Sequence, residues 1–217
     1  MQYGKIVKAT FVSRPNRFIA HVNIEGQKTV VHVKNTGRCR ELLVPGARVT
    51  LSVSDNPSRK TKYDLVAVWK GDTYINMDSQ APNQAAGEAL WHLIPGAKQV
   101  KGEVTHGESR LDFCVETDKE KWFVEVKGVT LEKDGHALFP DAPTERGIKH
   151  LHTLIQCVEE GHKAAALFVI QMKGVHSFSP NDQMHPAFGE TLRKAAKAGV
   201  EIWAYDCRNT KTGMALD

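Results

Sequence analysis

The chain has 217 residues, of which 41% are hydrophobic and 25% are charged, and its formal net charge is +4. This length suits one domain or two small ones, with enough apolar residues for a packed core. No apolar run approaches the roughly 18 residues that a membrane-spanning helix needs, and the N-terminus lacks the pattern of a signal peptide. We therefore expect a soluble, cytoplasmic protein. The four cysteines are widely scattered, which favours structural thiols over disulfides or zinc ligands.

Charge is unevenly distributed along the chain. Residues 1–80 contain 13 Lys and Arg against 6 Asp and Glu, a net of +7, whereas residues 81–217 contain 16 against 19, a net of −3. A basic first part is typical of a surface that binds a polyanion such as nucleic acid. The acidic remainder suits carboxylates that need a cation. A solvated basic face without a partner explains the first pattern equally well.

Residues 1–80 read as an all-β domain. Runs of apolar and β-branched residues between turn residues predict five strands, and a short helical segment is expected at residues 40–44. Five strands with a helix after the third match a small barrel of the OB type, a common scaffold for nucleic-acid binding. The expected strands are residues 6–12, 18–24, 29–33, 48–53 and 63–69.

Basic residues of this first part fall mostly in its turns. Basic grooves with aromatic rings bind single strands with little sequence preference, although the nearby Phe18 is expected to be a core residue. Backbone amides of the turn Asn35-Thr36-Gly37-Arg38 could meet a phosphate, and ordinary turn geometry is an equally good explanation. The candidates for nucleic-acid binding here are Arg14, Arg17, Lys34, Asn35 and Arg38.

Composition changes after residues 71–82, which are the expected linker. The remaining residues, 81–217, predict a helix, three strands, a helix, a strand, a helix and a strand. This order is typical of an α/β domain with a mixed sheet. Asp141 or Thr144 is expected to cap the second helix. The expected elements are residues 85–94, 100–105, 111–115, 122–131, a helix ending near 160, then 164–172, 186–199 and 200–205.

The hairpin at residues 110–127 carries the clearest chemical signal. Side chains alternate between the two faces of a strand, so Glu125 and Lys127 point the same way, and Asp112 on the partner strand is within cross-strand reach. Two carboxylates can hold Mg²⁺, which lowers the pKa of a bound water, and a lysine can orient that water or a phosphate. Phosphodiester hydrolysis is one interpretation. An exposed hairpin with one ion pair is the other, because a Glu-x-Lys triplet is common by chance.

Two basic residues, Arg146 and Lys149, lie near the start of the following helix. The amides and the dipole of a helix N-terminus already favour anions there, which predicts a clamp for a nucleic-acid backbone. Solvated charge on an ordinary helix explains the pair equally well. His150 and His152 point to different sides of this helix, so we expect no metal chelate from them.

Several strings of the chain together resemble the sugar fermentation stimulation protein A (SfsA) family, and the resemblance covers essentially the whole sequence. It implies an N-terminal OB-like nucleic-acid-binding domain at residues 1–80. It also implies a C-terminal nuclease-like domain of the PD-(D/E)XK type at residues 81–217. The strings that carry the resemblance are 109–113, 124–131, 139–147 with His150-Leu151, 35–38 and 102–104.

The resemblance also implies roles for individual residues. Asp112, Glu125 and Lys127 match the catalytic signature of PD-(D/E)XK nucleases, with Mg²⁺ or Mn²⁺ as the cofactor. Glu88 matches the early-helix glutamate of such enzymes, and Glu103 would be a further metal ligand, so four acidic residues are expected at the metal.

Two details concern the flanks of the signature aspartate. The proline that usually precedes it is replaced by Leu111, at a position that varies among such nucleases. Arg110, one residue earlier, joins Arg146 and Lys149 as a candidate for nucleic-acid binding.

Two functions are therefore expected as alternatives. The first is a metal-dependent nuclease that acts on DNA, with RNA as a second candidate substrate. The second is a non-enzymatic DNA-binding regulator of sugar-utilisation genes that keeps a nuclease-like fold. A carbohydrate-sensing module is suggested only by the name of the family, and no residues of the chain point to a sugar pocket.

Overall fold

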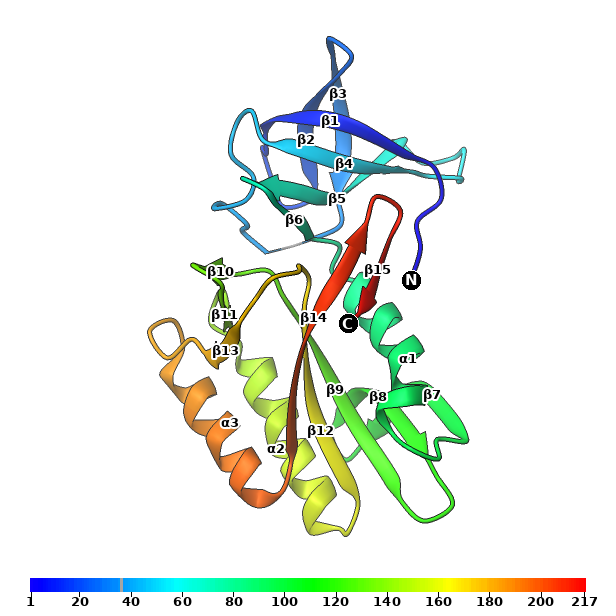
Figure 1. Ribbon diagram of the computed structural model, residues 1–217, viewed down its shortest axis with the longest axis vertical. Helices are drawn as coiled ribbons and strands as arrows, with labels where there is room; N and C mark the ends of the chain where they lie inside the picture. Colours follow the sequence, from blue (N-terminus) through cyan, green and yellow to red (C-terminus); the bar gives the residue numbers. More distant parts are fainter. Residues whose placement is uncertain (36) are drawn as a thin grey trace. The chain divides into compact units, whose positions relative to one another are not determined.

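The structure is a computed structural model that describes residues 1–35 and 37–217 (Figure 1). The chain divides into two compact units. The first consists of Met1–Ala81, Gln171–Lys173 and Cys207–Ala215, and the second of Pro82–Ile170, Gly174–Asp206 and Leu216–Asp217. Two short segments from late in the chain therefore belong to the first unit.

No helix within the described residues is both long and apolar enough to cross a membrane.

The first unit is built around a closed five-stranded barrel. Strand β1 pairs antiparallel with β2 and β4, β2 with β3, and β4 with β5. A parallel pairing between β3 and β5 closes the ring, which is the arrangement of an OB fold. A further strand, β6, extends the sheet beyond β5. The strands are β1 (Ile6–Ser13), β2 (Ile19–Ile24), β3 (Gln27–Val33), β4 (Arg48–Val53), β5 (Tyr63–Lys70) and β6 (Thr73–Asn76).

Alternate side chains of the barrel strands point inward and form its core. Val22, Val31, Leu51, Leu65 and Val68 are each fully buried, and burial of such apolar surface is the main favourable term in folding. The five predicted strands of the OB-type barrel are thereby confirmed.

Three expectations for the first unit are wrong. Residues 40–44 contain a turn closed onto the Cys39 carbonyl oxygen instead of a helix. The expected linker at residues 71–82 contains strand β6 and the buried Asp78. Phe18 is 56% exposed, because it precedes β2 at the end of a turn and does not enter the barrel.

The second unit is organised on a mixed sheet. Strands β7 and β8, and β8 and β9, pair antiparallel, whereas β12 pairs parallel with both β9 and β14. The predicted order of helix, three strands, helix, strand, helix and strand is confirmed. The elements are α1 (Ala81–Leu93), β7 (Gln99–His106), β8 (Ser109–Glu116), β9 (Lys121–Val129), α2 (Glu145–Glu159), β12 (Lys163–Ile170), α3 (Pro186–Ala198) and β14 (Glu201–Thr210).

Short strands add to this plan. Strands β10 (Glu132–Lys133), β11 (His136–Phe139) and β13 (Ser177–Pro180) form a separate three-stranded sheet. Strand β15 (Gly213–Leu216) follows β14 and pairs with it at the edge of the mixed sheet, and Cys207–Ala215, which include most of β15, belong to the first unit. None of the four was predicted, because strands of two to four residues are too short to show an alternating pattern.

Helix α2 begins with a side-chain cap. The hydroxyl oxygen of Thr144 accepts a hydrogen bond from the Gly147 amide at 3.0 Å, which satisfies one of the free amides of the first turn. The helix packs on β8, β9 and β12 and against α3. Of the expected apolar face, Leu151 is buried, whereas Ile148, Ile155 and Val158 are partly exposed. The buried stripe also includes His150 and Cys157, so it is rotated about the helix axis relative to the expected face.

Candidate functional site

The ladder between β8 and β9 ends at the pair Phe113–Val124. Asp112 and Glu125 are the next opposite positions, so their side chains face the same side of the hairpin. There the Oδ2 atom of Asp112 accepts a hydrogen bond from the Val126 amide at 2.7 Å. The carboxylate thus takes the place of a main-chain acceptor where the two strands separate.

Asp112 has a second partner from α1. Its Oδ1 atom accepts a hydrogen bond from the Nδ2 atom of Asn83 at 2.7 Å. Burial raises the pKa of Asp112 and the neighbouring Glu125 carboxylate raises it further, against the opposing effects of Val126, Asn83 and Lys127. Asp112 is therefore a carboxyl group whose charged form lacks full compensation.

Glu125 is almost completely buried, with 3% of its surface exposed. Its Oε1 atom accepts a hydrogen bond from the Nζ atom of Lys127 at 2.5 Å and is bonded to the Nδ1 atom of His150. Burial alone would raise the pKa of Glu125, but His150 and Lys127 outweigh it and hold the pKa below its usual range. The other oxygen, Oε2, is buried without any hydrogen-bond partner among the described residues.

His150 connects this carboxylate to the start of α2. Its Nε2 atom accepts a hydrogen bond from the Nε atom of Arg146 at 3.3 Å. A carboxylate oxygen can only accept a hydrogen bond, so the Nδ1 atom that faces Glu125 is the donor of that bond. Arg146 and His150 thereby fix Oε1 and leave Oε2 as the unsatisfied atom.

The pKa of Asp112 is raised and that of Glu125 is lowered. Opposite pKa shifts in neighbouring carboxyl groups are typical of functional pairs. A buried oxygen without a donor is costly to keep, and a cation would satisfy it. Within residues 1–35 and 37–217, no three His, Cys, Asp or Glu side chains are grouped so that they could hold a metal ion. The side-chain oxygens that this cluster could offer to a cation are those of Asp112 and Glu125.

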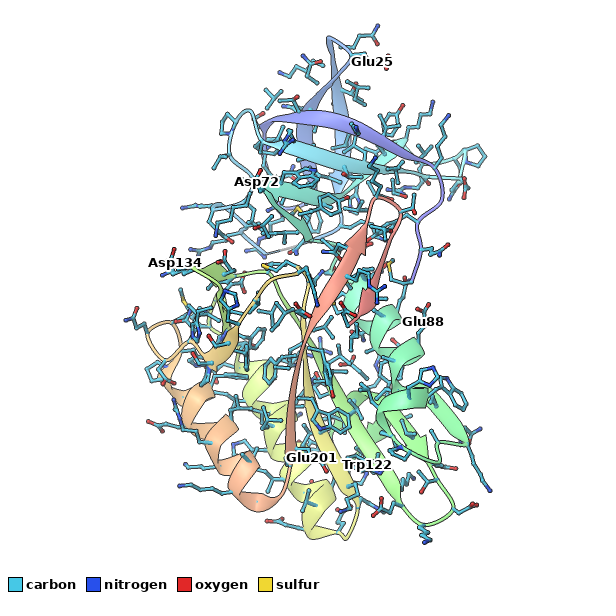
Figure 2. All side chains as sticks on the ribbon, viewed as in Figure 1. Glu25, Asp72, Glu88, Trp122, Asp134 and Glu201 are labelled. Carbon is cyan, nitrogen blue, oxygen red and sulfur yellow. The ribbon has the colours of Figure 1, made fainter. Side chains whose placement is uncertain are left out.

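The other two predicted ligands are not brought to this pair. Glu88 is exposed on α1 and lies roughly 140° around the helix axis from Asn83, at 3.6 residues per turn. Figure 2 shows its side chain on the outer side of the helix. Glu103 has a positive φ of 56°, is 73% exposed and pairs with Arg110 at 3.5 Å. Both predictions are therefore corrected by the structure: within the described residues, neither glutamate joins Asp112 and Glu125 in a group that could hold a metal.

Arg14 is also corrected, because its donors are used within the barrel. Its Nη1 atom donates to the carbonyl oxygens of Gly37 and Arg38, and its Nη2 atom to those of Arg17 and Asn35, at 2.6–2.9 Å. All four terminal N–H groups are occupied, so none is left for a phosphate. Arg14 holds the loop instead of binding nucleic acid.

Two further candidates in the same loop are structural as well. The Nζ atom of Lys34 pairs with the buried Asp78 at 2.9 Å. The Asn35 side chain donates to the Met77 carbonyl oxygen at 2.8 Å and accepts from the Gly37 amide at 2.7 Å. The predicted turn includes residue 36, which lies outside the described residues.

The remaining basic candidates lie at the surface. Arg17 and Arg38 are exposed on the first unit, and Arg110, Arg146 and Lys149 on the second. Of these, Lys149 lies 3.6 Å from the exposed Glu108, a contact that contributes little in water. These five cations remain accessible to a phosphate backbone.

Asn83 and His150 are functional candidates that the sequence did not single out. His150 was dismissed as a chelate, although its spacing of four residues from Arg146 places both side chains on one helix face. Asn83 had no signal in the sequence, since only the packing of α1 on β8 brings it to Asp112. Gly87, one turn later, permits that packing: a Cβ atom there would lie 3.2 Å from the Phe113 ring.

Comparison with known proteins gives matches over most of the chain. Residues 12–77 match the family described as "SfsA N-terminal OB domain", and residues 80–213 match "Sugar fermentation stimulation protein RE domain". A sugar fermentation stimulation protein homolog from Clostridium beijerinckii is 53% identical over 95% of this chain and 92% of its own length. Another from Desulfitobacterium hafniense (strain DSM 10664 / DCB-2) is 54% identical over 99% of this chain and 94% of its own.

A solved structure is similar as well. The structure of Pyrococcus furiosus SfsA in complex with Ca²⁺ is 28% identical, covers 100% of this chain and 95% of its own, and superposes with a TM-score of 0.89. From its two matched domains and its relatives at about half identity, this chain belongs to the sugar fermentation stimulation protein (SfsA) family.

Proposed function

We propose that this protein is a metal-dependent nuclease that hydrolyses phosphodiester bonds of DNA, with residues 1–80 as a nucleic-acid-binding domain and residues 81–217 as the nuclease-like domain. The observation that carries the proposal is the buried, unpartnered Oε2 atom of Glu125 beside Asp112. Burial of two carboxylates without full compensation is costly, and a nearby positive charge would lower that cost.

The donor set fits a hard divalent cation. Asp112 and Glu125 offer only oxygen, and Mg²⁺ is usually held by one or two carboxylates while it keeps several waters. The Pyrococcus furiosus relative was solved as a complex with Ca²⁺, another hard cation. When bound, Mg²⁺ or Mn²⁺ lowers the pKa of a coordinated water and offsets charge on the phosphate. Asp112 and Glu125 would hold it, together with the main-chain oxygen of Val126.

The other residues of the cluster have positioning roles. Lys127 is held at Oε1 of Glu125, where its remaining N–H donors would orient the attacking water. His150 and Arg146 fix the same oxygen, so that Glu125 presents Oε2 to the cation. Asn83 and the Val126 amide orient Asp112 in the same manner.

Binding of the substrate would come from exposed cations. DNA carries closely spaced negative charge, and each lysine or arginine that meets a phosphate adds affinity that decreases with salt. Five exposed residues supply this charge in the proposal: Arg17, Arg38, Arg110, Arg146 and Lys149.

The test is cleavage of plasmid and of labelled single-stranded DNA with Mg²⁺ or Mn²⁺. Asp112→Asn, Glu125→Gln and Lys127→Met are expected to lower the rate at least about 100-fold. Glu88→Gln and Glu103→Gln are the matched controls, since both remove an acid that lies away from the pair, and they should cleave at nearly the wild-type rate.

Equal cleavage by the wild type and Asp112→Asn would reject the proposed site. Absence of cleavage by every form, with salt-dependent DNA binding retained, would instead support the alternative function of a non-enzymatic DNA-binding regulator. The corrected positions of Glu88 and Glu103 are the observation that keeps this alternative open, because they leave two acidic ligands where four were expected.

A further inference from the structure

A concave pocket of about 800 Å³ lies on the first unit, and neither Asp112 nor Glu125 is among the residues that line it. Its floor is the outward face of β1, β4, β5 and β6. The β2–β3 turn forms one wall, and residues 209–211 form another. A volume of this size is typical of sites for small molecules or single nucleotides.

The floor presents one continuous row of side chains across four strands. Thr10 pairs with Arg48, and Trp69 pairs with Tyr74. Val49 pairs with Val68 in the antiparallel ladder between β4 and β5, so Arg48 and Trp69 are the next residues that lie opposite each other. Directly opposite residues point to the same face of a sheet, which places two rings and a guanidinium side by side.

These groups hold one another in place. The Arg48 guanidinium lies over the Trp69 ring, 4.8 Å from its centroid. The Trp69 and Tyr74 ring centroids are 4.9 Å apart, and the two ring planes are inclined by 44°. The Tyr74 hydroxyl donates to the Thr50 hydroxyl oxygen at 2.9 Å. A rigid aromatic platform of this kind loses little conformational entropy when a ligand stacks on it.

The charge of the pocket favours an anion. Lys8, Arg48 and Lys211 line it, against the single carboxylate of Glu25. Figure 2 shows Glu25 at the tip of the β2–β3 hairpin. Aromatic rings beside lysine and arginine match the two chemical parts of a nucleotide, a flat base and a phosphate.

An unsatisfied acceptor adds to this picture. Asn209 lines the pocket, and its Nδ2 atom donates to the carbonyl oxygens of Tyr74 and Gln171, at 3.1 and 2.7 Å. Its Oδ1 atom is buried and has no partner among the described residues. An N–H or O–H donor of a bound base or sugar would satisfy such an atom.

We propose that this pocket binds a nucleotide of a single-stranded nucleic acid, with the base on the Trp69–Tyr74 platform and phosphate near Lys8, Arg48 and Lys211. OB folds commonly bind oligonucleotides on the face of their second and third strands. This pocket lies elsewhere, on β1, β4 and β5 with the added β6. Binding here requires neither Asp112 nor Glu125, so it goes beyond the proposed hydrolysis.

The test is fluorescence anisotropy of a labelled oligothymidylate with the full chain in EDTA, where no divalent cation permits cleavage. Trp69→Ala is expected to weaken binding about tenfold or more, because base stacking is removed, and Trp69→Phe should keep most of the affinity. The double variant Lys8→Ala/Lys211→Ala should weaken binding and reduce the salt slope by about 0.7 for each phosphate that is no longer neutralised. Trp91→Ala, at an exposed tryptophan of α1, and Lys28→Ala, at an exposed lysine of β3, are the matched controls.

Wild-type affinity in both Trp69→Ala and the double lysine variant would overturn the proposal. If Trp69→Ala fails to fold by circular dichroism, the double variant decides, because both lysines are exposed. Thymidine monophosphate is a second probe: displacement of the strand only at a large excess supports a strand site, and equal affinity for the monophosphate contradicts it. The strand assay in EDTA reports binding alone and the cleavage assay with Mg²⁺ reports hydrolysis, so a failure of the pocket and a failure of the nuclease proposal are distinguishable.

Discussion

Removal of the Lys127 charge, with Glu125 left in place, is predicted to destabilise the protein strongly. The side chains of Glu125 and Lys127 are 4% and 15% exposed, so Lys127→Met leaves a buried carboxylate with one compensating donor fewer. Breaking a buried pair in this way typically costs about 3–5 kcal/mol. His150 still bonds Oε1, and we therefore expect the lower end of the range, about 3 kcal/mol.

The double variant Glu125→Gln/Lys127→Met separates this charge effect from simple loss of packing. It removes the buried carboxylate of Glu125 together with the Lys127 ammonium, and replacement of a whole buried ion pair is often nearly neutral, so it should be more stable than Lys127→Met. The assay is urea unfolding followed by circular dichroism, in EDTA so that no cation stabilises the folded state. The reasoning would be refuted if Lys127→Met were as stable as the wild type, or if the double variant were less stable than Lys127→Met.

Three further predictions concern stability. Arg14→Ala leaves four main-chain carbonyl oxygens without their donor, and the free energy of unfolding in urea should fall by at least about 2 kcal/mol. An unchanged midpoint would contradict the role of Arg14 in holding the loop. Burial raises the pKa of Asp64, but the Arg59 hydrogen bonds help to bring it below its usual value. Its stabilisation is therefore present above pH about 4 and lost as the pH falls further, so the stability advantage of the wild type over Asp64→Asn should shrink in acid, and a constant difference is the adverse result. Thr144→Ala should cost about 1 kcal/mol by loss of the α2 cap, whereas Thr144→Ser should not; equal losses in both variants exclude the cap.

The barrel and the central hairpin could be predicted because their signals are local. Strand alternation alone places Glu125 and Lys127 on one side of β9, and the structure adds only that Lys127 bonds to the carboxylate. The order of helices and strands in the second unit likewise follows from apolar periodicity. Short strands such as β10 and β15 give no such period, so they escape a sequence-based prediction.

The rest of the candidate site depends on tertiary packing. His150 is buried because α2 packs on β9 with the His150 side chain facing Glu125. The apolar residues of α2 alone do not determine this rotation of the helix about its axis. The positive φ of Glu103 turns it out of the regular strand, and an alternating pattern cannot show that. Arg14 looks like a surface cation in the sequence, yet three of the four carbonyl oxygens that it bonds come from more than twenty residues away.

Binding of Mn²⁺ to the metal-free protein, measured by electron paramagnetic resonance, tests the central claim most directly. The geometry predicts a site that is lost in Asp112→Asn and in Glu125→Gln and is retained in Glu88→Gln and Glu103→Gln. Undiminished Mn²⁺ binding in the first two variants, or its loss in the last two, would contradict a cation site built from Asp112 and Glu125.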